Sequence, residues 1–269
     1  DLATLVMRMK ENNPDRVIYL ADARQSMHFI QVFRCARKTG IVPDTTELVH
    51  IGFGTMNGKD GKPFKTRDGG VMRLEYLLKE IDDEMLNKIK ENQKEKENLN
   101  IDEAEAKQTA KTVALAAVKY GDLSNQASKD YIFDIDRFTS FEGNTGPYIL
   151  YTIVRIKSIL SKYEAKGGDI SALKDAIMPA VNAGQKNLML SLAKFNATIE
   201  SAYEESAPHK ICAYIYELAN AFNGFYHDTK ILSEENEELK KSYISLLVLT
   251  KEILEACIDM LGFSAPDRM

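Results

Sequence analysis

The amino-acid sequence predicts an α/β region with a short parallel sheet, followed by an all-α bundle. Two apolar runs, Arg16–Ala21 and Leu48–Phe53, flank a segment with helical spacing. This is the strand–helix–strand order of a parallel βαβ unit. From Leu74 onward the apolar spacing is helical, and no β pattern reappears. With 44% hydrophobic and 28% charged residues, the chain has enough apolar surface for a globular core.

The first elements follow from local signals. Residues 1–12 suit a helix that ends before Pro14, and the helix between the two strands has apolar residues at helical spacing and a stop at Gly40. Two strands are too few for a stable open sheet, so we expect the remaining strands to lie elsewhere. The chain opens at Asp1, without Met and inside a helical pattern. We therefore expect a piece of a longer protein.

The helical part divides into a connector and a bundle. Residues 79–100 are charged and low in complexity, which favours a solvated helix or connector. An Asn100 cap with Glu103 three residues later predicts a helix to about Tyr120, ended by Gly121. Further helices are expected over 146–166, 169–204, 209–227 and 234–261. The predicted domains are 1–78, 79–120 and 121–269.

Charge and cysteine content exclude several classes. Residues 1–78 carry a net charge of +3 and residues 79–269 a net charge of −8, within a total of −5, so bulk charge does not indicate nucleic-acid binding. Three scattered cysteines without a CxxC pair, and four histidines without ligand spacing, argue against a disulfide framework and a bound metal, and fit a reducing compartment. No apolar run approaches the roughly 18 residues of a membrane span.

A glycine-rich basic loop over residues 58–70 is the most informative local stretch. Its glycines let the backbone approach a ligand closely, and its cations are Lys59, Lys62, Lys65 and Arg67. A loop after a parallel strand lies where ligands bind in open α/β sheets, and this one suits a polyphosphate. It does not fit the GxxxxGK[ST] pattern of P-loop NTPases. On local pattern alone, a solvated surface hairpin is an equal alternative.

Residues 62–70, followed by Arg73 and Leu74, resemble the signature loop of arginyl-tRNA synthetases. In class I synthetases this is the KMSKS loop, which closes over ATP, and residues 63–67 occupy its five positions. Lys65, Thr66 and Arg67 would then be its catalytic residues, with Thr66 where the family motif has its second lysine. Further segments resemble the family in the same order: 22–29, 119–125, 141–148 and 266–269.

The resemblance implies the second half of a Rossmann-like catalytic domain with the KMSKS-like loop, a helical connector and an α-helical anticodon-binding (DALR-type) domain. It places the family's HIGH motif upstream of Asp1. It assigns Asp1 and Gln25 to arginine binding, and it assigns to ATP binding Phe53, Gly54, Met56, Lys62, Phe64 and His28. The residues alone leave simpler roles open. Asp1 and Gln25 could be ordinary polar residues at helix starts. His28, Phe53 and Met56 could pack in the core.

Tyr148, Tyr151 and Arg155 recur at spacings of three and four, on one face of a helix. Aromatic platforms with a nearby guanidinium suit unstacked RNA bases, although a core stripe has the same period. The resemblance assigns these three residues and Met269 to the tRNA anticodon loop. A frayed chain end has no packing reason to be Arg268–Met269, which favours the same interpretation.

The resemblance implies arginine–tRNA ligase activity, with ATP and its Mg²⁺ as substrate and with tRNA(Arg) and arginine as partners. We expect no tightly bound metal and no association with a membrane. We expect a cytoplasmic monomer that is inactive alone, because half of the ATP site is missing. The alternatives are a non-catalytic helical RNA-binding or scaffolding module, and an ATP-binding domain of unrelated chemistry.

Overall fold

The computed structural model describes residues 1–62, 73–95, 102–173 and 176–269, and divides the chain into two compact units. The first comprises Asp1–Phe64 and Asn125–Ile132, and the second comprises Lys65–Ser124 and Phe133–Met269. In the described ranges no helix is long and apolar enough to cross a membrane.

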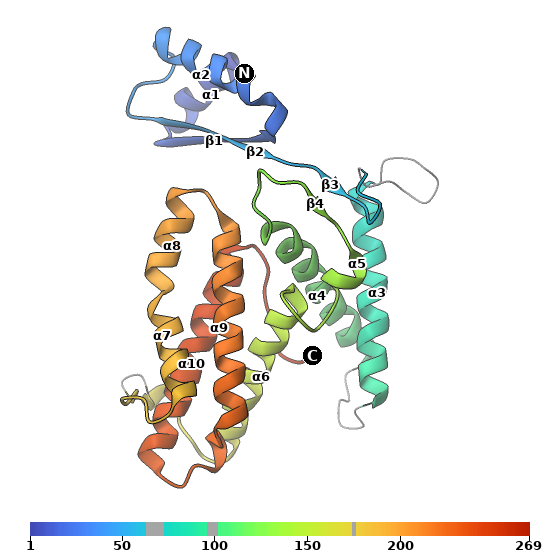
Figure 1. Cartoon of the computed structure of the whole chain (residues 1–269), viewed down its shortest axis with the longest axis vertical. Helices are drawn as coiled ribbons and strands as arrows, with labels where there is room; N and C mark the ends of the chain where they lie inside the picture. Colours follow the sequence, from blue (N-terminus) through green and yellow to red (C-terminus); the bar gives the residue numbers. More distant parts are fainter. Residues whose placement is uncertain (63–72, 96–101, 174–175) are drawn as a thin grey trace. The chain divides into compact units, whose positions relative to one another are not determined.

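The first unit is built on the predicted strand–helix–strand motif (Figure 1). Its elements are α1 (Leu2–Asn12), β1 (Arg16–Asp22), the 3₁₀ turn η1 (Ala23–Gln25), α2 (Ser26–Lys38) and β2 (Glu47–Phe53). β1 and β2 pair in parallel, from Arg16 opposite Glu47 to Asp22 opposite Phe53. The core joins both helices to the sheet through Leu5, Val17, Ala36 and Val42. The parallel pairing is therefore confirmed.

A second, very short parallel pair joins residues far apart in the sequence. β3 (Met56–Asn57) pairs with β4 (Tyr131–Ile132). Extended structure thus reappears after residue 74, contrary to the sequence-based expectation, because two residues are too few to produce an alternating pattern. Gly54 permits this approach: an added Cβ would lie 2.5 Å from the backbone of Lys129.

The second unit begins its described part with two long helices, α3 (Leu74–Glu95) and α4 (Glu103–Leu123), which pack on each other. The charged segment is a helix, as expected, but it also has a buried stripe: Leu77, Ile81, Met85 and Ile89. The cap of α4 is Asp102, which accepts a hydrogen bond from the Glu105 N–H, while Asn100 lies outside the described residues.

Gly121 does not end α4, contrary to the sequence prediction, because the helix continues to Leu123. A Cβ at this position would lie 2.5 Å from the ring of Phe138. The glycine thus allows close packing between α4 and the short helix α5 (Ile135–Phe138). The ring of Phe138 also stacks edge-on against Phe133.

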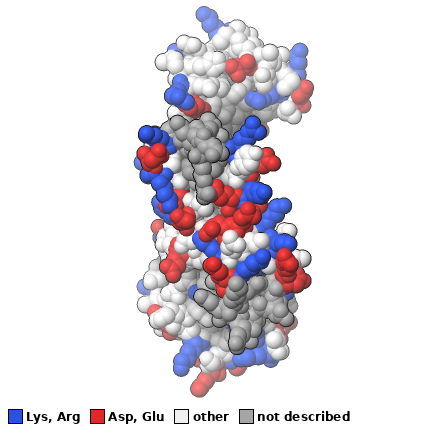
Figure 2. Space-filling view, turned by 90° about the vertical axis from the view of Figure 1, so that its right-hand side faces the viewer, with Lys and Arg blue, Asp and Glu red and all other residues white. Residues whose placement is uncertain are grey.

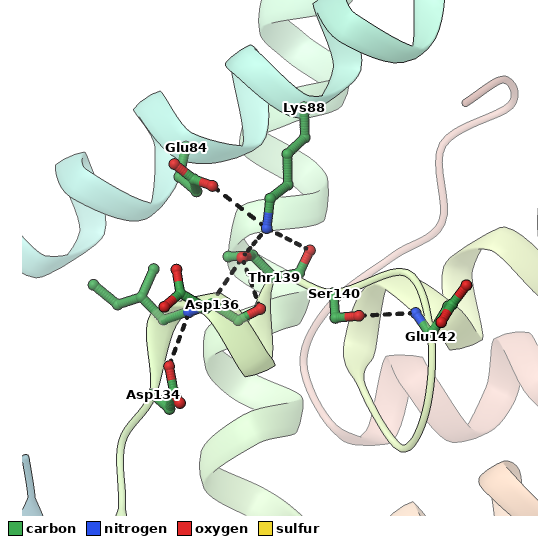
Figure 3. A network of polar contacts seen from close by, with 8 residues as sticks. Glu84, Lys88, Asp134, Asp136, Thr139, Ser140 and Glu142 are labelled. Atoms are coloured by element: carbon green, nitrogen blue, oxygen red, sulfur yellow. Dashed lines mark hydrogen bonds and ion pairs between the residues drawn. The ribbon is translucent and has the colours of Figure 1, made fainter. Parts of the chain in front are cut away.

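A polar network ties α3 to the segment that leads into α6 (Gly146–Ala165) (Figure 3). Lys88 Nζ donates to the Thr139 hydroxyl at 2.7 Å and lies 3.4 Å from a Glu84 carboxylate oxygen. Thr139, fully buried, donates in turn to the Ile135 carbonyl at 2.8 Å. Because Thr139 is the C-cap of α5, the Lys88 ammonium holds the end of that helix.

The remaining helices form the rest of the bundle. They are η2 (Ser171–Leu173), α7 (Ala183–Ala193), α8 (Phe195–Glu204), α9 (Pro208–Asp228), η3 (Ile231–Ser233) and α10 (Glu237–Met260). α7 and α8 pack on α9, and α6 packs on α4, α9 and α10. The single helix predicted over 169–204 is wrong: Pro179 lies within a non-helical stretch over residues 176–182, and Asn182 caps a new helix.

Candidate functional site

The carboxyl edge of the β1–β2 pair brings together residues expected to bind arginine and ATP. Parallel strands end at the same edge, where ligands bind in open α/β sheets. His28 Nε2 lies 2.7 Å from Oδ2 of Asp1, with both side chains about half exposed. Gln25 is exposed at the N-cap of α2, one helical turn before His28. The histidine assigned to ATP thus contacts the carboxylate assigned to arginine.

Asp22, the last residue of β1, forms an ion pair with Arg24 at this edge. Its carboxylate accepts from Arg24 Nε at 2.9 Å, from Nη2 at 2.6 Å and from the Arg24 backbone N–H at 2.8 Å. The hydrogen bonds from Arg24 lower the pKa of Asp22 to about 2. The ion pair fixes the turn that carries the chain from β1 into α2.

The stretch that contains the predicted ATP-binding residues Phe53, Gly54 and Met56 begins at the end of β2. Phe53 is exposed and Met56 is half-buried. The Gly54 N–H donates to the Ala127 carbonyl at 2.9 Å, and the Thr55 N–H donates to the Asp130 carboxylate at 2.6 Å. These backbone donors therefore hold the returning segment 125–132. Sequence analysis did not identify Asp130, whose side-chain carboxylate accepts the hydrogen bond from the Thr55 N–H.

The glycine-rich loop is described only up to Lys62. The Gly58 N–H donates to the Lys62 carbonyl at 2.8 Å, which makes the tight turn that the glycines predict. The Lys62 side chain is exposed. Phe64, Lys65, Thr66 and Arg67 lie outside the described residues.

A second group lies on α6 and α9. The Tyr148 hydroxyl donates to Asn220 Oδ1 at 2.6 Å and accepts from Asn223 Nδ2 at 2.9 Å. Arg155 Nη1 donates to Asn223 Oδ1 at 2.7 Å, and its guanidinium carbon lies 4.7 Å from the centre of the Tyr151 ring. Tyr148, Tyr151 and Arg155 are half-buried, so they are neither core residues nor free surface residues.

Sequence analysis missed the α9 side of this group, which consists of Asn220, Asn223 and Tyr226. The Tyr226 ring centre lies 5.5 Å from the Arg155 guanidinium carbon, and 41% of the residue is exposed. A signal was present: asparagine is a poor helix former, and two asparagines three residues apart in one helix indicate a side-chain role.

The C-terminal tail is attached to the bundle. Arg268 donates to both carboxylate oxygens of Glu105 at 3.1 Å, and Lys157 Nζ lies 3.3 Å from the Asp267 carboxylate. The expectation of a frayed end is wrong for Arg268, whose charge has a structural partner on α4. Met269 is half-buried, and the contacts described above for the α6–α9 group do not include it.

Charge on one face of the molecule is mixed. On the face drawn in Figure 2, basic and acidic side chains lie next to each other and form no single continuous basic area among the coloured residues. Among the described residues, no group of three His, Cys, Asp or Glu side chains is placed to hold a metal ion.

Two family models match the chain. The first, described as the catalytic domain of class I tRNA synthetases (R), matches residues 1–135. The chain belongs to the arginyl-tRNA synthetase family. The second, the DALR anticodon binding domain, matches residues 149–269, which contain α9 and most of α6. The resemblance read from the sequence is confirmed.

Similar proteins support the same family. The arginine–tRNA ligase of Alkaliphilus oremlandii is 54% identical over 269 residues, which is 100% of this chain and 44% of the relative. That of Francisella tularensis is 44% identical over 271 residues, covering 100% and 45%. The chain therefore spans less than half the length of these arginyl-tRNA synthetase relatives.

Solved structures share the fold. Arginyl-tRNA synthetase from Plasmodium falciparum matches with a TM-score of 0.82 at 27% identity, over 100% of this chain and 44% of that one. The Thermus thermophilus enzyme matches with a TM-score of 0.78 at 24% identity, over 95% and 41%. The predicted combination of a partial Rossmann-like domain and a helical bundle is thus confirmed for this chain.

Proposed function

We propose that this chain carries the anticodon-reading bundle and the KMSKS-like loop of an arginine–tRNA ligase. The observation that carries the proposal is the α6–α9 group, where Tyr148, Tyr151, the Arg155 guanidinium and the exposed Tyr226 ring gather. All of these except Tyr148 lie within residues 149–269, which the anticodon binding model matches. Rings and guanidinium planes are the groups on which unstacked RNA bases pack. The partner is tRNA(Arg), read at its anticodon loop by Tyr148, Tyr151, Arg155 and Met269.

The proposed reaction has two steps. A carboxylate oxygen of arginine attacks the α-phosphorus of ATP, and the bond to pyrophosphate breaks, which leaves arginyl-adenylate. A terminal ribose hydroxyl of tRNA then attacks the arginyl carbonyl and releases AMP. No side-chain nucleophile is required, because positioning and charge stabilisation carry both steps. Magnesium enters with ATP.

The residues predicted to bind arginine and ATP, and those of the KMSKS-like loop, have assigned roles in this proposal. Asp1 accepts two hydrogen bonds from the substrate guanidinium, with Gln25 beside it, because a planar fork of donors is best matched by a carboxylate. The contact from His28 orients that carboxylate. Phe53, Gly54, Met56, Lys62 and Phe64 line the ATP side, and Lys65, Thr66 and Arg67 stabilise the charge that develops on pyrophosphate.

The decisive experiment is tRNA binding by the chain at fixed salt. We expect a transcript of tRNA(Arg) to bind more tightly than the same transcript with an altered anticodon, and we expect Tyr151→Ala to abolish the difference. Tyr203→Ala, which removes an exposed ring from α8, is the matched control and should preserve discrimination. Equal binding of both transcripts would favour a helical scaffolding or non-specific RNA-binding module instead.

A second experiment tests catalysis. We propose that the chain is a cytoplasmic monomer and that it does not aminoacylate tRNA by itself, because the family's HIGH motif is not among its residues. Turnover of arginine, ATP and tRNA(Arg) by the purified chain would contradict this. Hydrolysis of ATP without tRNA would instead support an ATP-binding domain of unrelated chemistry.

A further inference from the structure

The side-chain amide of Asn223 bridges two residues of α6 that the proposed function places against RNA. Its Nδ2 donates to the Tyr148 hydroxyl at 2.9 Å, and its Oδ1 accepts from Arg155 Nη1 at 2.7 Å. Nδ2 also lies 3.4 Å from the hydroxyl of Thr152, between the two on α6. One amide on α9 therefore contacts three successive turns of the neighbouring helix.

The chemistry of these contacts fixes the orientation of the amide. A guanidinium has only donors, so the amide oxygen must face Arg155. An amide turned by half a rotation would place its N–H groups against the N–H groups of the guanidinium. The nitrogen then faces Tyr148, whose hydroxyl accepts this hydrogen bond and donates its own O–H to Asn220 Oδ1. The charge on Arg155 therefore sets the direction of the two hydrogen bonds that Asn223 makes with Arg155 and Tyr148.

The same contacts decide where the recognition groups lie. Arg155 has a long side chain with many rotamers, and the bond to Asn223 selects one in which the guanidinium lies over the Tyr151 ring and near the Tyr226 ring. Among the described contacts, Arg155 donates one hydrogen bond, through Nη1. Its further N–H groups are the donors that a base edge or phosphate requires.

We infer that Asn223 is a positioning residue for RNA recognition, which orders the Tyr148 ring and the Arg155 guanidinium before RNA arrives. The inference rests on the proposed anticodon-reading function and adds a residue that does not itself need to touch RNA. A side chain that is already ordered in the free protein loses less conformational entropy on binding, so binding is more favourable. Asn223 thus acts on affinity and discrimination through its neighbours.

The test compares tRNA binding by variants of the chain. Asn223→Ala removes both bonds, and we expect its affinity for the tRNA(Arg) transcript to fall about tenfold, the scale for releasing two ordered side chains. Asn223→Asp keeps an acceptor for Arg155 but has no N–H for Tyr148, so its affinity should lie between those of wild type and Asn223→Ala. Asn187→Ala, an exposed asparagine of α7, is the matched control and should bind like wild type.

Two readouts separate positioning from a general structural role. In an Arg155→Ala background, the loss of affinity caused by Asn223→Ala should be smaller than in the wild-type background, because Arg155, one of the two side chains that Asn223 orders, is gone. In the free chain, nitrogen NMR of the Arg155 guanidinium should show hindered rotation that Asn223→Ala releases. An undiminished effect in the Arg155→Ala background would overturn the inference, as would wild-type binding by Asn223→Ala.

The outcome also separates this inference from the proposed function. If the wild-type chain does not distinguish the two anticodons, the proposed function fails, and the RNA role of Asn223 fails with it. If the wild-type chain discriminates and Asn223→Ala discriminates equally, only the positioning role is refuted. Release of the guanidinium rotation together with lost discrimination supports both.

Discussion

Gly146, the first residue of α6, lies against the backbone of α4. A methyl carbon built on it would stand 2.6 Å from the carbonyl carbon of Ala116 on α4, and closer still to the oxygen. Both atoms belong to the backbone of a long helix, so no side-chain rotation relieves the clash. The substitution Gly146→Ala therefore forces α4 and α6 apart, or tilts the first turn of α6.

The magnitude follows from this geometry. Ordinary contact begins at 3.4 Å, so the helices must separate by roughly 1 Å over the contact and lose packing on both sides. Overpacking of this kind costs about 1–3 kcal/mol, and the rigid neighbour favours the upper end. Alanine returns about 0.4–1 kcal/mol by restricting the unfolded chain. We expect a net loss of about 2 kcal/mol in the free energy of unfolding.

Urea unfolding, followed by far-ultraviolet circular dichroism, measures this loss, and Gly224→Ala is the control. Gly224 lies within α9 and has no atom within 4 Å of its built Cβ. The same substitution there should raise the unfolding free energy by about 0.4–1 kcal/mol, because it improves helix propensity without a clash. If Gly146→Ala proves as stable as Gly224→Ala, the close approach of α4 and α6 does not exist in solution.

Two further predictions concern titration and thiol reactivity. Arg24 lowers the pKa of Asp22 from 3.8 to about 2. The ion pair therefore stabilises the fold above about pH 4, and this contribution is lost as the pH falls toward 2. NMR of the Asp22 side-chain carboxyl carbon should follow this titration, and Arg24→Gln should return the pKa toward 3.8. Burial raises the pKa values of the Cys212 and Cys257 thiols to about 12, whereas Cys35 is exposed. A thiol reagent should therefore label one cysteine in the native chain and three after unfolding. Rapid labelling of all three cysteines in native buffer would contradict the buried positions of Cys212 and Cys257.

Local patterns predicted the elements that depend on local causes. The apolar runs of β1 and β2 required burial in a sheet, and the single helix between them required parallel pairing, as found. The helix predicted over 146–166 is found as Gly146–Ala165, and its start is stabilised by the Thr145 hydroxyl, which accepts from the Tyr148 N–H.

Features that depend on distant partners were not predictable from one sequence. The buried stripe of α3 is hidden in a highly charged composition, and the packing role of Gly121 depends on a ring seventeen residues away in sequence. The contacts of Asn223 with α6 require knowledge of which helices are neighbours. Recognition of the family supplied Tyr148 and its α6 neighbours, but a motif carries no information on the amides that orient its side chains.

The return of segment 125–132 to the first unit has a consequence for synthesis. A ribosome makes a chain from its N-terminus, so β1, α2 and β2 emerge well before the strand that pairs with β3. Until Tyr131 has left the exit tunnel, Gly54 and Thr55 lack the carbonyl and carboxylate that satisfy their N–H groups. The first unit can therefore complete its folding only after α3 and α4 have been translated. A ribosome that stalls while it translates α3 or α4 would leave the β3–β4 pair unformed, and chaperones could bind this incompletely folded unit.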